Sequence, residues 1–176
     1  MRHIDTHDTG CDCLQLPVPG GQNVVMERTV FETVGGDQAV LDLARAWHQR
    51  CLQDPVVSHA FSHPGQHPHH VERLAAYWAE ALGGPPVYTE TMGDHSHVLR
   101  MHSGNGEHDD MDERAQQCFA LALDDAGLPH DQRLRSTLTD WFRWAIAAMA
   151  AYPRSADEVP SALSMPRWSW DGPVRA

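Results

Sequence analysis

The chain of 176 residues contains no lysine, so every permanently positive side chain is an arginine. Acidic residues outnumber basic ones 24 to 13, and the formal net charge is −11. A surface of this sign repels phosphate backbones and anionic lipid headgroups. The composition therefore argues against nucleic acid and against an anionic membrane surface as partners.

Long apolar runs are also missing. A membrane-spanning helix needs about 20 apolar residues, and the closest candidate, residues 141–152, is too short and contains Arg143. The first residues lack the apolar stretch of a signal peptide. We therefore expect a cytoplasmic protein that does not enter the membrane.

Cysteine is scarce, and the four cysteines do not form the pattern of a disulfide framework. Cys51 and Cys118 fall within amphipathic helical patterns, where free cysteine usually packs as a small apolar side chain. Cys11 and Cys13 form a C-x-C pair near the amino terminus, and we expect exposed thiols without a role there.

Helical periodicity dominates the chain, and no strand pattern stands out. Apolar residues recur every three to four positions over four long segments, about 37–52, 67–82, 111–126 and 131–152. Short helical segments are expected at 56–61 and 98–102, and Asp37 is the expected cap of the first long helix. The pattern predicts an all-α fold over 29–152, with extensions at 1–28 and 153–176. Trp168 and Trp170 could pin the second extension to the body.

One segment has a residue order that suits the binding of a cofactor. The helix that contains Tyr77 and Trp78 ends at Gly83-Gly84-Pro85-Pro86, Tyr88 follows, and the next short apolar segment ends in His102. This order suits a chain that covers one face of a flat cofactor with a helix and ligates its metal from the other face. With Gly35-Gly36 upstream and Asp112-Glu113-Arg114 downstream, it resembles the group II truncated haemoglobins over about residues 29–152.

The resemblance implies a globin-like, two-over-two helical sandwich that binds one b-type haem. His102 would be the axial ligand of the iron. His70 would face the bound gas or could ligate the iron as a sixth ligand, and His48 would be a second donor. The remaining residues expected to contact the haem are Phe61, Arg73, Leu74, Tyr77, Trp78, Tyr88, Val98 and Arg100, with the two arginines as partners of the propionates.

Two features depart from the family pattern. Gln117 takes the place of a tryptophan that often lines the distal pocket from the penultimate long helix. The loop after His102 contains Gly104 and Gly106 instead of a proline–aromatic pair.

The resemblance further implies reversible binding of dioxygen, nitric oxide and carbon monoxide. If the protein is an enzyme, it would be a haem-dependent oxidoreductase, for example one that oxidises nitric oxide or reduces peroxide. The chain has no reductase domain, so turnover would need an external electron donor.

Two other interpretations stay open. The chain has 13 histidines, and His63, His67 and His70 have spacings of four and three, so they could bind zinc or nickel without haem. Alternatively, the fold could serve as a sensor or scaffold that holds no cofactor.

Overall fold

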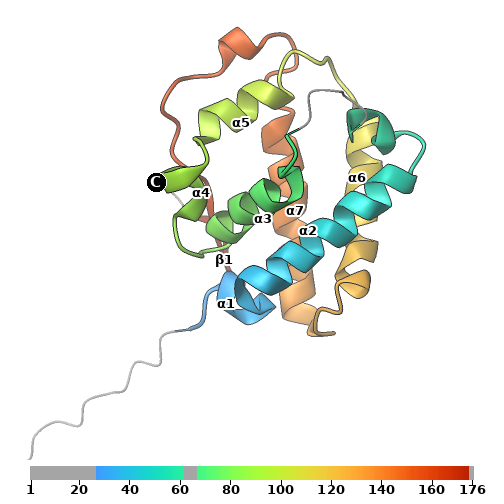
Figure 1. Cartoon of the computed structure of the whole chain (residues 1–176), viewed down its shortest axis with the longest axis vertical. Coiled ribbons are helices and arrows are strands. Elements are labelled where there is room, and N and C mark those ends of the chain that lie inside the picture. Colours follow the sequence, from blue (N-terminus) through green and yellow to red (C-terminus); the bar gives the residue numbers. More distant parts are fainter. Residues whose placement is uncertain (1–26, 62–66, 175–176) are drawn as a thin grey trace, which may run out of the picture.

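The computed structural model describes residues 27–61 and 67–174. Within these ranges the chain is mainly helical, and four long helices form two stacked layers (Figure 1). Helix α2 packs against α3 in one layer, and α6 packs against α7 in the other. The long helices are α2 (Gly36–Gln53), α3 (His70–Ala81), α6 (Asp109–Asp125) and α7 (Gln132–Met149). The all-α, two-over-two globin architecture expected from the sequence is confirmed.

Shorter elements connect and flank the two layers. They are α1 (Val30–Val34), η1 (Val57–Phe61), α4 (Val87–Thr91), α5 (His95–His102) and η2 (Ala156–Glu158), with strands β1 (Arg167–Ser169) and β2 (Gly172–Val174). Helix α4 was not predicted. The two strands form an antiparallel hairpin in which Arg167 pairs with Val174; it lies in the carboxy-terminal segment, where no strand pattern stood out in the sequence.

The first long helix begins differently from the prediction. It starts at Gly36 after Gly35, which has a φ of 118° and provides no side-chain cap, and Asp37 lies in the first turn. A carboxylate in this position still interacts favourably with the helix dipole. The cap in this region belongs to α1, where Thr29 and Glu32 form a reciprocal capping box.

Aromatic side chains from all four long helices form the centre of the core. Trp78 of α3 contacts Trp47 of α2, Phe119 of α6, and Trp141 and Phe142 of α7, with ring centroids 5.4 to 5.7 Å apart. Three of these contacts are edge-to-face and the one with Trp47 is tilted, and edge-to-face contacts add to the hydrophobic stabilisation of each ring. Trp78 therefore joins α3 to both helices of the other layer and fixes its position there.

A tight turn ends α3 and begins the path to α5. Gly83 has a φ of 96°, and Gly84 donates its N–H to the carbonyl of Ala79 at 2.8 Å. A Cβ at Gly84 would lie 2.7 Å from that carbonyl oxygen, which explains why glycine is needed at this position. The turn allows the chain to reverse at once into α4.

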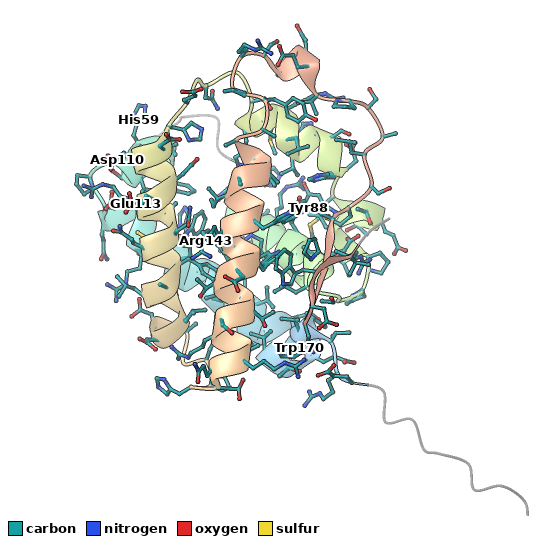
Figure 2. The ribbon with its side chains drawn as sticks, turned by 180° about the vertical axis from the view of Figure 1, so that it is seen from behind. His59, Tyr88, Asp110, Glu113, Arg143 and Trp170 are labelled. Atoms are coloured by element: carbon teal, nitrogen blue, oxygen red, sulfur yellow. The ribbon has the colours of Figure 1, made fainter. Side chains whose placement is uncertain are left out.

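The residues after α7 lie against the body. They pass over α5 and return as the hairpin toward α1 (Figure 1). Trp168 is buried against Trp144 of α7, and Trp170 donates its indole N–H to the carbonyl of Arg28 at 2.7 Å. Figure 2 shows Trp170 beside α1. Both tryptophans therefore pin this segment to the body, as expected.

The hairpin also neutralises a buried carboxylate at the end of α3. Glu80 is 1% exposed and accepts hydrogen bonds from the N–H and the hydroxyl of Thr89 at 3.0 and 2.8 Å. The guanidinium of Arg167 lies 3.6 Å from the same carboxylate and donates to the carbonyl of Gly84 at 2.8 Å. A buried charge without a counter-ion is costly, so Arg167 stabilises the carboxylate of Glu80. Its hydrogen bond to Gly84 also ties the hairpin to the turn after α3.

Arg167→Met should therefore destabilise the protein, because Glu80 would lose its cationic partner. The expected loss is about 1–3 kcal/mol, less than for a fully buried pair because Arg167 is partly exposed. The urea-unfolding midpoint measures the change. Arg143→Met is the matched control, because Arg143 pairs with Asp140 on an exposed surface; equal stability of the two variants would contradict the prediction.

Candidate functional site

Helix α3 has two faces with different surroundings. Ala75, Trp78 and Leu82 are buried in the core. His70, Leu74 and Tyr77 follow a spacing of four and three, which places them together on a neighbouring face. Tyr77 on this face contacts α5, so the face with His70 lies toward the segment that contains the expected axial histidine.

Three rings from three elements meet on this side of the molecule. His48 of α2 lies 4.9 Å from Phe61 of η1 and 5.6 Å from His70 of α3, measured between ring centroids. Phe61 and His70 are 5.9 Å apart. The structure therefore brings together the two histidines that the resemblance assigned to the gas-binding side and Phe61, which it assigned to the haem contacts.

The two histidines of this group have a free nitrogen. The Nε2 atoms of His48 and His70 are buried and have no hydrogen-bond partner among the described residues. Burial lowers the pKa of both rings below 6.5, and for His70 the neighbouring His48, His102 and His67 lower it further. Both rings are therefore neutral at pH 7, and each can donate or accept through Nε2, depending on its tautomer.

Helix α5 carries the expected axial histidine. Asp94 caps it by accepting from the N–H of His97 at 2.8 Å, and this cap extends the helix to His95 instead of the predicted start at 98. His102 lies in the last turn, and its Nδ1 is 2.8 Å from the carbonyl oxygen of Val98. An Nδ1–H that donates to this carbonyl leaves Nε2 unprotonated and able to ligate a metal.

His102 and Val98 share one face of α5, because they are four residues apart. Val98 is 8% exposed and belongs to the main core, whereas the ring of His102 lies at the exposed end of the helix. A positive charge on His102 lowers the pKa of His70, so the two rings lie within electrostatic reach of each other. Met101, the residue before His102, is 57% exposed and does not share the burial of Val98.

A buried hydrogen bond joins α3 to the start of α5. The hydroxyl of Tyr77 lies 2.7 Å from Nδ1 of His95, and both side chains are less than a tenth exposed. Tyr88 packs edge-on against Tyr77. This pair was not predicted from the sequence, since no local pattern links residues 18 positions apart.

The two arginines expected at the propionates have protein partners. Arg73 donates to the carbonyl of Met92 at 2.8 Å and lies over the ring of Tyr88. Arg100 lies near Val159, Pro160 and Ser161 of the carboxy-terminal segment at 3.3 to 3.4 Å. The guanidinium of Arg100 thus holds that segment, and its role at a propionate stays a prediction.

Two further expectations need correction. Gln117 lies on the exposed face of α6 and donates to Glu113 at 3.2 Å. The buried face of this helix carries Ala115 and Cys118, and the helical rotation between neighbouring residues places Gln117 outside that face. Gln117 therefore does not line the pocket. Trp78, expected to contact the haem, packs instead among the aromatic side chains of the core.

The histidine-rich alternative gains no support from the part of the chain that the structure describes. No group of three or more His, Cys, Asp or Glu side chains is arranged there to hold a metal ion. His63 of the proposed cluster lies outside the described residues. His67 accepts a hydrogen bond from the backbone N–H of His69 through its Nδ1, so this ring already has a partner.

The residues present fit a haem better than a bare metal ion. On one side, two buried and unpartnered imidazole nitrogens lie beside Phe61. On α5, a third imidazole has its Nδ1 bonded to the carbonyl four residues before it. One oriented histidine on α5 and two neutral imidazoles on the other side would suit a haem, whose iron would take His102 as its protein ligand and leave a position for a gas beside His48 and His70.

Comparison with known proteins supports this interpretation. The family model described as "Bacterial-like globin" matches residues 29–148. A haemoglobin from Chloroflexus aurantiacus is 25% identical with a TM-score of 0.59, and the match covers 70% of this chain and 98% of that chain. A thermostable haemoglobin from Thermobifida fusca is 26% identical with a TM-score of 0.56, covering 77% and 100%. No curated protein matches.

The group II truncated haemoglobin from Bacillus anthracis has the same fold, with a TM-score of 0.61 at 23% identity and coverage of 76% of this chain and 98% of that chain. The chain belongs to the bacterial-like globin family, and the predicted resemblance to truncated haemoglobins is confirmed in family and fold. Membership supports haem-based binding of gases such as dioxygen as the general activity. Among the described residues, none of the helices combines the length and apolar character that a membrane crossing needs.

The Tyr77–His95 pair predicts a pH dependence of stability. Burial lowers the pKa of His95 below 6.5, although Asp94 opposes this shift. The unfolded chain therefore takes up the proton at a higher pH than the folded protein, and the stability that His95 contributes is lost as the pH falls below about 6.5.

His95→Gln should reduce this loss, because glutamine accepts the hydrogen bond from Tyr77 but does not titrate. Between pH 7.5 and pH 5.5, the urea-unfolding midpoint should fall less in the variant than in the wild type. Equal falls in the two proteins would show that His95 is not the group responsible.

Proposed function

We propose that the protein binds one b-type haem through His102 and holds a diatomic gas on the opposite side of the haem. The observation that carries the proposal is the hydrogen bond between Nδ1 of His102 and the carbonyl of Val98. It directs Nε2 away from the helix as a free metal ligand. The unpartnered Nε2 atoms of His48 and His70 support a polar gas-binding side.

The haem contacts that we propose come from three elements. Phe61 of η1, Leu74 and Tyr77 of α3, and Val98 of α5 would supply the apolar walls. Arg73 is the candidate partner for the propionates, because a guanidinium matches carboxylate geometry. Tyr88, which packs on Tyr77 and under Arg73, would hold both of these side chains in place.

The bound haem would supply an iron atom for dioxygen, nitric oxide or carbon monoxide and a redox centre. His70 would stabilise the partial negative charge on a bound gas by donating through Nε2. His48 would be a second donor beside it. In the resting protein, His70 could instead occupy the sixth position of the iron.

We also propose that the bound haem could support redox turnover. Oxidation of nitric oxide or reduction of peroxide would need electrons from an external donor. We propose the cytoplasm as the site of action.

His102→Gly should abolish stable haem binding, because the iron would lose its protein ligand. Added imidazole should restore binding, since it can occupy the space of the missing ring. Haem content after gel filtration measures both effects. His97→Gly on the exposed face of the same short helix controls for loss of helix stability, and unchanged haem content in His102→Gly would exclude His102 as the ligand.

His70→Leu should accelerate dioxygen dissociation roughly tenfold, the effect of losing one hydrogen bond to a partly charged ligand. Stopped-flow displacement of dioxygen by carbon monoxide measures the rate. His69→Leu is the control, because His69 is exposed. An unchanged rate in His70→Leu would remove His70 from this role.

A further inference from the structure

The segment after α7 is the least expected part of the molecule. We call residues 153–166 the strap; it contains η2 and leads into the hairpin. The strap lies beyond residue 148, where the match to the globin family ends. Figure 1 shows it passing along α5, on the outside of the two helical layers.

The strap is bonded to the middle of α5. The N–H of Leu163 donates to the hydroxyl of Ser96 at 2.9 Å, and Ser96 is only 1% exposed. The guanidinium of Arg100 lies 3.4 Å from the carbonyls of Val159 and Pro160. Because Ser96 and Arg100 are four residues apart, they present one face of α5 to the strap.

Two buried apolar side chains, one from α5 and one from the strap, accompany these bonds. Leu99 of α5 and Val159 of the strap are buried to 4% and 5% exposure, yet neither belongs to the main core cluster. Val98, the neighbour of Leu99, does belong to that core. Helix α5 thus lies between two packing surfaces, the core on the side of Val98 and the strap on the side of Ser96.

Both ends of the strap are anchored. Near its start, the N–H groups of Gly104 and Gly106 in the loop after α5 donate to the carbonyls of Tyr152 and Pro153 at 3.0 and 2.9 Å. Beyond its end, Arg167 is held by Glu80 and the carbonyl of Gly84. A segment fixed at both ends and bonded in its middle restricts the movement of the helix beneath it.

We propose that the strap is a brace for α5, and that Ser96 and Arg100 are positioning residues for His102. The inference rests on the proposed role of His102 as the axial ligand. Helix α5 has eight residues, so it moves as a short rigid rod, and a shift at Ser96 displaces the ring of His102. The strap would thereby set how firmly, and in which orientation, the ligand is held.

The brace can be tested without haem. Ser96→Ala removes the acceptor of the Leu163 N–H, and Val159→Ala removes apolar contact from the strap side. Both variants should increase the hydrogen-exchange rates of amides in α5 roughly tenfold, as expected for the loss of one buried interaction, while α3 keeps its protection. Ser164→Ala, at an exposed position of the strap, is the control. Unchanged exchange in α5 in both variants would overturn the brace.

The positioning role is tested with haem bound. In Ser96→Ala, the iron–histidine stretching band in the resonance Raman spectrum of the ferrous protein should shift or broaden, and haem transfer to an acceptor apoglobin should become several-fold faster. Faster exchange with an unchanged band would mean that the strap stabilises α5 without orienting His102, which overturns the positioning role. Failure of the proposed function would appear separately, as full haem binding by His102→Gly.

Discussion

The structure depends on the division of α3 into two faces. On one face, Trp78 is the residue on which aromatic side chains from the other three long helices converge. This contact fixes the rotation of α3, because an indole packed at this density has little freedom to move. The adjacent face, with His70 and Tyr77, is therefore held toward α5, and the candidate site follows from the core.

Helix α5 lies outside the two layers and is held by specific bonds. Tyr77 reaches its first turn through His95, and the strap bonds to Ser96 and Arg100. A helix of this length has little stability in isolation, so the fold around it must supply the order that a metal ligand needs. The buried Tyr77–His95 pair and the carboxy-terminal segment provide this order.

The long helices could be predicted from the sequence because each has a strong apolar period and a glycine or proline breaker. The gathering of His48, Phe61 and His70 followed from the family resemblance. Gln117 was misplaced because a shift of one residue rotates a side chain by about 100° around a helix. The strap and the Tyr77–His95 pair could not be predicted, because their bonds join residues that are far apart in the chain and belong to no periodic pattern.

Whether the protein holds a haem that is open to gases can be decided by an absorption spectrum. The purified protein, supplied with haem, is measured as isolated and again after reduction under carbon monoxide. A haem that is open to gases should give a sharp Soret band that shifts when carbon monoxide is added. A protein that stays colourless after haem is supplied, and shows no such band, would contradict it.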